Sequence, residues 1–237
     1  MCRMILATGK FNTADIVQAM VAVARGDTAD HEASFSQHPH GWGAVWRDMD
    51  APTGLSAMRE TTAAEISLLA SGLASVKTDF LAIHVRRTTS STTIGAQFTH
   101  PLKRPAEDWY FMHNGSQPTV HQFLGLPSST FDSAEYFDYL VPEGTASLDQ
   151  SEALERLRNI PEPGSNSGNA FAIKPDCAYV IHWRSPSDTW PRYFTMHETV
   201  SPDCRIISSE IVPALAPAEQ WTPLPPQTIL EIPIPND

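Results

Sequence analysis

Cysteine is scarce in this chain: three occur among 237 residues, and no Cys-x-x-Cys pair is found. Such sparse cysteines argue against a disulfide framework, and the missing pair argues against a thiolate zinc site. Basic clusters are missing too, because 16 Lys and Arg stand against 27 Asp and Glu, which gives a formal net charge of −11. We therefore expect no nucleic-acid partner, since neutralising phosphates requires clustered positive charge.

Long apolar runs are also missing. No segment reaches the roughly 18 apolar residues that a membrane span needs. The apolar run at the N-terminus stops at Gly9 and Lys10, too early for the core of a signal peptide. We therefore expect no membrane partner and a soluble, cytoplasmic protein. Intrinsic disorder is unexpected at 41% hydrophobic residues, which suffice for a substantial core at this length.

Hydrophobic periodicity and turn residues predict a helix-rich middle between two groups of strands. Helices are expected over residues 13–25, 132–140 and 149–159, and from the capping box at Thr62 and Glu65 onward. Strands are expected over residues 1–10, 41–46, 80–85, 109–113, 169–174, 177–184, 193–196, 205–208 and 228–232. This order lacks the regular alternation of a doubly wound sheet, so it indicates an α+β layered fold, taken as one domain over residues 1–237.

Cys2 directly follows the initiator methionine, so removal of Met1 would place a thiol and a free α-amine on one residue. An α-amine with a pKa of about 8 can act as a base at little cost, and a thiolate is a strong nucleophile. The amine can then activate the thiol directly or through one water. The alternative is a chance cysteine near a chain end.

Three further positions each have a structural and a functional interpretation. Arg86 ends an apolar strand and can hold a carboxylate through two parallel hydrogen bonds or form an ordinary surface ion pair. Asn114 and Gly115 form either a hairpin turn or an oxyanion hole, in which an amide and a backbone N–H face developing negative charge. Asp132 is either a helix N-cap or the group that binds an ammonium.

Nine histidines raise the question of a metal site. His38 and His40 form the closest pair, but the proline between them restricts how the two rings converge, and no His-Glu-x-x-His motif occurs. We expect loop or core histidines, and neither a metal nor another cofactor. A metal-dependent hydrolase that uses His38 and His40 is the weakest alternative.

Six short motifs follow one another along the chain: Met1-Cys2, His40-Gly41-Trp42-Gly43, Ala82-Ile83-His84-Val85-Arg86, Thr99-His100-Pro101, His113-Asn114-Gly115 and Asp132-Ser133-Ala134-Glu135. Near the C-terminus come Ser208-Ser209-Glu210, Trp221 and a proline-rich final strand. In this order they resemble the class II glutamine amidotransferases, a group of N-terminal-nucleophile hydrolases, over nearly the whole chain. The resemblance is greatest to the stand-alone branch, which includes γ-glutamyl hydrolases of ergothioneine synthesis and of glutathione breakdown.

The resemblance implies a four-layer αββα fold, in which two antiparallel sheets are stacked between helices. It implies that Cys2 is the nucleophile once Met1 is removed and that the freed α-amine is its base. Asn114 and Gly115 would then form the oxyanion hole. The implied reaction is attack on a γ-amide carbonyl, release of ammonia or an amine, and hydrolysis of a γ-glutamyl thioester.

The resemblance also assigns the groups that bind the substrate. Arg86 would hold the α-carboxylate of the glutamyl group, with Thr89 in a supporting position, and Asp132 would hold the α-ammonium. The family usually has this Asp two residues before the helix Glu, where this chain has Ser133, and a one-residue shift turns a side chain by roughly 100°. The Gly-Trp-Gly segment often follows Asp but here follows His40, so recognition can differ from that of plain glutamine.

The leading hypothesis is hydrolysis of a γ-glutamyl amide bond in glutamine or another small γ-glutamyl compound. The alternative is a glutaminase-type subunit, or an amino-acid-binding module, that works only with a partner synthase chain. We expect 237 residues to leave no room for a synthase domain within the chain. A separate synthase partner or a homo-oligomer therefore stays open, as does the amine side of the substrate.

Overall fold

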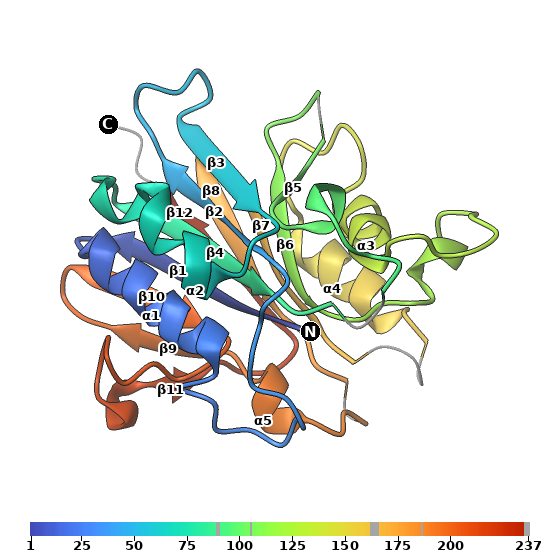
Figure 1. Ribbon diagram of the computed structural model, residues 1–237. Helices are drawn as coiled ribbons and strands as arrows, with labels where there is room; N and C mark the ends of the chain where they lie inside the picture. Colours follow the sequence, from blue (N-terminus) through green and yellow to red (C-terminus); the bar gives the residue numbers. More distant parts are fainter. Residues whose placement is uncertain (89–90, 105, 162–165, 186, 235–237) are drawn as a thin grey trace.

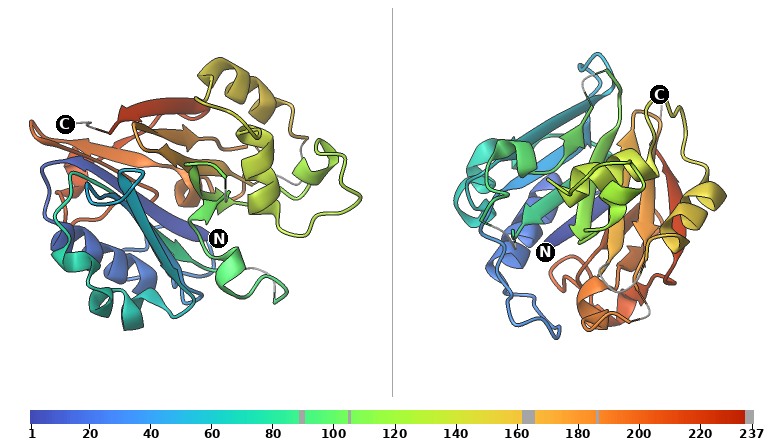
Figure 2. Two further views of the ribbon diagram at one scale, coloured as in Figure 1. Left: turned by 90° about the horizontal axis from the view of Figure 1, so that it is seen from above. Right: turned by 90° about the vertical axis from the view of Figure 1, so that its right-hand side faces the viewer.

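Two antiparallel sheets lie face to face, with helices on the outer side of each (Figure 1 and Figure 2). The computed structural model describes residues 1–88, 91–104, 106–161, 166–185 and 187–234. This is the αββα arrangement that the sequence predicts. No helix in these ranges combines the length and the apolar character needed to cross a bilayer.

The first sheet contains the N-terminal strand near its middle, in the order β11-β9-β10-β1-β4-β2-β3. Its strands are β1 (Cys2–Gly9), β2 (Trp42–Arg47), β3 (Leu55–Glu60), β4 (Phe80–Arg86), β9 (His197–Val200), β10 (Cys204–Ser208) and β11 (Thr222–Pro223). The second sheet has the order β12-β8-β7-β6-β5. Its strands are β5 (Leu102–Lys103), β6 (Tyr110–Gly115), β7 (Gly168–Lys174), β8 (Cys177–His182) and β12 (Thr228–Pro233). Strand β1 pairs with β4 from Cys2 onward and with β10 from Ile5 onward, so its first residues are held in the sheet by β4.

Helices cover the outer faces of both sheets. The α-helices are α1 (Thr13–Arg25), α2 (Ala64–Ser67), α3 (Asp132–Leu140), α4 (Gln150–Arg158) and α5 (Pro191–Phe194). Single turns of 3₁₀-helix are η1 (Leu69–Ser71), η2 (Leu73–Ser75), η3 (Ala96–Phe98), η4 (Val120–Gln122) and η5 (Ala218–Gln220). Helix α1 begins where the Asn12 side chain accepts a hydrogen bond from the Ala14 N–H and ends at Gly26, whose φ of 82° suits glycine.

The alternation of side chains along β1 places Cys2 between the sheets. Ile5 and Ala7 belong to the apolar cluster under α1, whereas Met4 and Leu6 belong to the cluster between the sheets. Because side chains alternate along a strand, Cys2 points the same way as Met4 and Leu6. The thiol therefore lies at the edge of the inter-sheet core.

The helix predicted from Thr62 and Glu65 is much shorter than expected. Helix α2 ends at Ser67, its cap position makes no side-chain hydrogen bond, and two 3₁₀ turns follow. The helical spacing predicts that Ile66, Leu69, Leu73 and Val76 face inward, but Ile66 and Leu69 are 71% and 49% exposed. The chain leaves the helical path within one turn, so only Leu73 and Val76 of this predicted face pack against the core.

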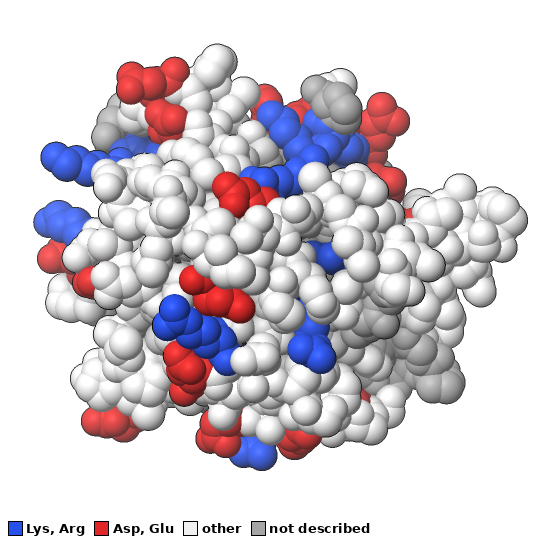
Figure 3. Space-filling view, viewed as in Figure 1, with Lys and Arg blue, Asp and Glu red and all other residues white. Residues whose placement is uncertain are grey.

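Charged side chains of both signs lie close together on the face shown in Figure 3. Exposed pairs include Arg192 with Asp30, whose Nη1 and Oδ1 are 3.0 Å apart, and Lys10 with Asp203, 3.7 Å apart. Such pairs contribute about 0–1 kcal/mol each, because water screens them. The stability of the fold therefore depends on other contacts.

One ion pair is buried and lies beside Cys2. Arg3 Nε is 2.7 Å from Glu210 Oε2, and both side chains are almost fully buried. Arg3 Nη1 also donates to the carbonyl oxygens of Tyr193 (2.6 Å) and Ser209 (2.7 Å), and its guanidinium lies 3.8 Å from the centroid of the Tyr193 ring. The Tyr193 hydroxyl donates in turn to the Cys2 carbonyl at 3.1 Å. This network fixes the backbone on which the Cys2 thiol is carried.

Arg3→Met is expected to lower the free energy of unfolding by about 3–5 kcal/mol, because Glu210 would stay buried without its cation. Chemical denaturation of both proteins would measure this difference. Lys10→Met is the matched control, since its partner Asp203 is exposed and the loss should stay within about 1 kcal/mol. Equal losses in the two variants would contradict a special role for the buried pair.

Candidate active site

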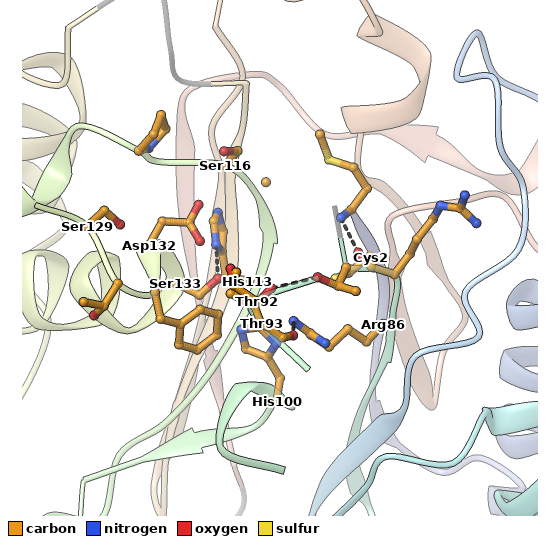
Figure 4. Close-up of a pocket in the computed structure, with 17 residues that line it drawn as sticks. Cys2, Arg86, Thr92, Thr93, His100, His113, Ser116, Ser129, Asp132 and Ser133 are labelled. Carbon is orange, nitrogen blue, oxygen red and sulfur yellow. Dashed lines mark hydrogen bonds between the residues drawn. The ribbon is translucent and has the colours of Figure 1, made fainter. Parts of the chain in front are cut away.

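A cavity of about 270 Å³ opens where β1 begins and where β4 and β6 end, beside the start of α3 (Figure 4). It brings together Cys2, Arg86, Gly115 and Asp132, which the sequence singles out from four distant segments. Of the other two predicted site residues, Asn114 is not among those that line the cavity, and Thr89 lies outside the described residues. The remaining lining residues are Met1, Arg87, Thr88, Thr92, Thr93, His100, His113, Ser116, Pro118, Ser129, Thr130, Phe131 and Ser133.

Cys2 begins β1 and is opposite Arg86 of β4 in the strand register. Met1 extends the ladder by one pair: its ammonium donates to the Arg87 carbonyl at 2.6 Å, and the Arg87 N–H donates to the Met1 carbonyl at 3.0 Å. The Cys2 backbone N–H donates to Asn114 Oδ1 at 2.9 Å. The nitrogen that becomes the α-amine on loss of Met1 is therefore already held by a side chain of the opposite sheet.

The Cys2 thiol is electrostatically different from the other two cysteines. Burial by itself raises the pKa of Cys2, but His84 and the N-terminal amine outweigh it and lower the pKa from 9.0 to about 6. Burial raises the pKa of both Cys177 and Cys204. With Met1 in place, a pKa of about 6 leaves Cys2 mostly thiolate at neutral pH, the form that acts as a nucleophile.

Asn114 and Gly115 end β6 and pair with Asn169 and Gly168 of β7, so they do not form the hairpin turn that an Asn-Gly pair suggests. A Cβ on Gly115 would lie 1.7 Å from the Ser167 carbonyl oxygen, so the close approach of β7 requires glycine here. The Asn114 Nδ2 group is buried and has no hydrogen-bond partner among the described residues. An unpaired buried donor costs about 1–3 kcal/mol, which points to a group that binds it in the working site.

Arg86 is a buried cation in the wall of the cavity, with 4% of its surface exposed. Its Nη2 donates to the Thr93 carbonyl at 2.7 Å, and within the described part of the chain it forms no ion pair. Burial lowers the pKa of Arg86, while negative charge on Cys2 and Asp132 raises it. Because guanidinium stays protonated in proteins, Arg86 offers a buried positive charge and is not the surface ion pair considered as an alternative.

Asp132 is the first residue of α3, and Phe131 takes the N-cap position. The Asp132 carboxylate lines the cavity and accepts a hydrogen bond from the Gln117 N–H at 2.8 Å. Ser133, which stands where the family has its Asp, contacts His113 Nδ1 through its hydroxyl at 2.9 Å (Figure 4). The cavity thus keeps a carboxylate beside the helix start, and it comes from Asp132.

Three histidines, His84, His100 and His113, are buried at the site, and the sequence predicts them as core or loop residues. His84 Nε2 lies 3.1 Å from the His113 carbonyl oxygen, and its ring centroid lies 4.3 Å from that of His100. Burial lowers the pKa of His100 well below its usual range and that of His113 to about 4. Period-two spacing could have identified His84, because it shares a strand face with Arg86.

The His38 and His40 pair has other contacts. His40 Nδ1 accepts a hydrogen bond from the Thr88 N–H at 3.0 Å, and the His38 ring is fully buried. Within the described ranges, no three His, Cys, Asp or Glu side chains gather in a way that could hold a metal ion. The geometry gives no support to the metal-dependent alternative.

Comparison with solved structures shows the same fold in chains of low sequence identity. The glutamine phosphoribosylpyrophosphate amidotransferase from B. subtilis, complexed with ADP and GMP, matches with a TM-score of 0.61 and 14% identity over 100% of this chain and 50% of that chain. An allosteric regulatory enzyme of purine biosynthesis matches with a TM-score of 0.65, 14% identity and the same two coverages. A glutamine aminotransferase class-II domain protein from Silicibacter pomeroyi matches with a TM-score of 0.58 and 16% identity over 99% of this chain and 100% of that chain.

The present chain spans about half the length of the first two proteins. No curated protein matches its sequence. The family model of the class-II glutamine amidotransferases matches residues 1–159, which include Cys2 and every other site residue described above except Ser167, Asn169 and Gly168 of the neighbouring strand. The chain therefore belongs to the class II glutamine amidotransferases and has their N-terminal-nucleophile hydrolase fold.

Proposed function

We propose that the protein hydrolyses the γ-amide bond of glutamine or of another small γ-glutamyl compound, with Cys2 as nucleophile after loss of Met1. Membership of the amidotransferase family supports amide hydrolysis in general. The observation that carries the proposal is that the Asn114 side chain holds the Cys2 nitrogen through one atom and leaves a second, buried atom able to donate to the substrate. Its Oδ1 holds the Cys2 nitrogen at 2.9 Å, and its buried Nδ2 is unpartnered among the described residues.

The proposed reaction follows from these positions. The Cys2 thiolate attacks the γ-carbonyl carbon, a C–S bond forms, and the carbonyl electron pair moves onto oxygen, where the Asn114 Nδ2–H donates to it. When this intermediate collapses, the C–N bond breaks, and the leaving nitrogen takes the proton that the α-amine of Cys2 received from the thiol, so that it departs as ammonia or an amine. Water then cleaves the thioester, which releases glutamate and restores the thiol. The Gly115 backbone N–H is the proposed second donor of the oxyanion hole.

The charged groups of the cavity suit the α-amino-acid end of a glutamyl substrate. Arg86 supplies a buried guanidinium that matches a carboxylate, and Asp132 supplies a carboxylate that matches an ammonium. Thr89 keeps its proposed supporting role, although its position is not described. A cavity of about 270 Å³ suits a small amino-acid derivative.

Arg86→Lys is expected to raise KM for the glutamyl substrate about 10–100-fold and to change kcat less. The reason is that lysine keeps the charge but loses the planar pair of donors, and hydrogen bonds to charged groups are worth about 1.5–3 kcal/mol. Steady-state kinetics would measure both constants. Arg47→Lys is the control, because Arg47 pairs with Asp79 outside the cavity. An unchanged KM in Arg86→Lys would remove Arg86 from the proposed carboxylate site.

A substrate panel tests the proposed function itself. Purified protein that lacks Met1 would be incubated with glutamine, glutathione and other γ-glutamyl amides, and released glutamate would be quantified. We expect release from at least one of them, and loss of that release in Cys2→Ala. Release that is equal in wild type and Cys2→Ala would overturn the proposal.

A second function is supported by the length comparison. The chain spans half of the B. subtilis enzyme, so the same fold also occurs as part of a longer amidotransferase. In this alternative the protein is a glutaminase-type subunit that passes ammonia to a separate synthase chain. Glutamate release by the isolated protein, undiminished after size-exclusion chromatography, would argue against the need for a partner.

A further inference from the structure

The two backbone polar groups of Cys2 point away from β4. Met1 and Arg87 exchange two hydrogen bonds, of 2.6 Å and 3.0 Å, so they form a hydrogen-bonded pair of the antiparallel ladder. Such pairs alternate with non-hydrogen-bonded pairs, so Cys2 and Arg86, the next pair along, share no backbone hydrogen bond. The Arg86 N–H agrees with this, because it donates to the Gly41 carbonyl on the opposite side, toward β2.

On the other side of β1, the neighbouring strand begins too late to reach Cys2. The pairing with β10 starts at Ile5, opposite Ser208. The Cys2 groups that point this way are instead bonded by side chains. The Cys2 N–H donates to Asn114 Oδ1 at 2.9 Å, and the Cys2 carbonyl accepts from the Tyr193 hydroxyl at 3.1 Å. One side chain from the second sheet and one from α5 therefore take the place of a pairing strand.

Loss of Met1 leaves Cys2 dependent on these two side chains. It removes both hydrogen bonds to Arg87, so the first hydrogen-bonded pair of the ladder between β1 and β4 is then Arg3 with Val85. Within the described part of the chain, the backbone of the new first residue is then bonded only to the amide oxygen of the second sheet and to the hydroxyl of α5.

Tyr193 is itself held firmly in place. Its side chain is fully buried, and the Arg3 guanidinium lies 3.8 Å from the centroid of its ring. Phe35 and Phe194 pack against the ring edge to face, with centroids 5.5 Å and 4.9 Å away. Burial raises the pKa of Tyr193 above its usual range, so the hydroxyl keeps its proton and can donate. Tyr193 is not among the described residues that line the cavity, so it can influence the reaction only through Cys2.

We propose that Tyr193 is a positioning residue for the nucleophile. Its hydroxyl fixes the Cys2 carbonyl, and Asn114 fixes the Cys2 nitrogen, so together they fix the Cα from which the thiol reaches the substrate. Rotation about the Cα–Cβ bond is then the main freedom left to the thiol. Tyr193 lies beyond residues 1–159, which the family model matches, so this assignment goes beyond the motifs of the family. Its effect on turnover rests on the proposed function, whereas the hydrogen bond itself does not.

Tyr193→Phe tests the proposal by steady-state kinetics, because it keeps the buried ring and removes only the hydroxyl. We expect kcat to fall about 10–100-fold, since a displacement of about 1 Å in a reacting group can cost on the order of 10²-fold in rate. KM should not change, because Tyr193 does not line the cavity. Tyr139→Phe is the matched control, since its hydroxyl also donates to a backbone carbonyl, that of Arg156 at 3.0 Å, and it should keep the wild-type kcat. A loss of kcat below about threefold in folded Tyr193→Phe, no more than one lost hydrogen bond accounts for, would overturn the proposal.

An NMR measurement reads the hydrogen bond without substrate. Isotope labels at the carbonyl carbon of cysteine and the nitrogen of arginine select the Cys-Arg steps of the chain, which begin at Cys2 and Cys204. In Tyr193→Phe the Cys2 carbonyl signal should move upfield, as carbonyl carbons do when they lose a hydrogen-bond donor. The Cys204 signal is the internal control, because its carbonyl accepts from the Ser201 N–H at 2.8 Å. A Cys2 signal that does not move would contradict the proposal.

The wild-type sequence covers the case in which Tyr193→Phe does not fold. Biosynthetic replacement of tyrosine by fluorotyrosine makes the hydroxyl more acidic and therefore a stronger donor. The Cys2 signal should then move downfield, because Tyr193 is its partner, and the Cys204 signal should stay in place. Identical Cys2 signals in the two proteins would overturn the hydrogen bond. Both NMR readings can fail while Cys2→Ala still loses activity, so this proposal and the proposed function are judged separately.

Discussion

Replacing Cys2 with alanine is expected to abolish hydrolysis of the γ-glutamyl amide, with a loss on the order of 10⁶-fold or down to the background of the assay. No other thiol can take over. Cys204 is opposite Gly9 at the far end of β1, and Cys177 is opposite Lys174 at the far end of β7. Burial raises the pKa of both, so neither is a ready nucleophile at neutral pH.

The controls for this variant are Cys177→Ala and Cys204→Ala, which should keep full activity. Thermal unfolding would show that Cys2→Ala is folded, and we expect a small change because the backbone contacts of residue 2 do not involve the thiol. Intact mass provides a second check, since the active species must lack Met1 if the α-amine takes part. Full activity in protein that quantitatively retains Met1 would refute that part of the mechanism.

Short-range patterns predict an α+β layered fold and single out four of the cavity residues, and the family resemblance adds the two stacked sheets. Cys2 is identified by its position after Met1, Arg86 by its place at the end of an apolar strand, and Asp132 by its place at a helix start. Spacing alone does not predict that these segments lie together in the fold; the family resemblance, carried by the order of the motifs, does. The structure confirms the two-sheet arrangement, and it brings Cys2, Arg86, Gly115 and Asp132 to one cavity.

What the sequence could not predict depends on contacts between distant segments. Residues 193–196 have the apolar character of a strand, yet Tyr193 lies in α5, which begins with Pro191 at a position where proline favours a helix. The contacts of this helix are with residues far away in the sequence. The Tyr193 hydroxyl donates to the Cys2 carbonyl, and the Tyr193 carbonyl accepts from Arg3. A local pattern carries no information about such a partner.

His84 and Asn114 illustrate the same limit within the site. The position of His84 depends on the register of β1 against β4, and a shift by one residue would turn the ring to the other face of the sheet. Asn114 has the sequence signature of a turn, and only the pairing of β6 with β7 shows that it lies in a strand and reaches across to Cys2. Register and cross-sheet contact are properties of the whole fold.

Asn114→Ala is expected to lower kcat by about 10²–10³-fold, equivalent to about 2.7–4 kcal/mol of transition-state stabilisation, with little change in KM. The reason is that Nδ2 donates to an oxygen that carries full negative charge only in the tetrahedral intermediate. Asn114→Asp separates the two functions of the side chain. It keeps an acceptor for the Cys2 nitrogen but replaces the donor with an acceptor, so kcat should fall at least as far as in Asn114→Ala.

Asn169 supplies the matched control for this prediction, because it is opposite Asn114 on β7 and all of its polar groups are occupied. Its Nδ2 donates to the Phe194 carbonyl at 2.7 Å, and its Oδ1 accepts from the Trp183 N–H at 3.0 Å and contacts His182. Asn169→Ala should therefore lower the free energy of unfolding by about 1–3 kcal/mol while kcat stays within a few-fold of wild type. If Asn114→Ala instead lost stability and kept its kcat, the Asn114 amide would have no role in catalysis. Other donors would then have to form the oxyanion hole.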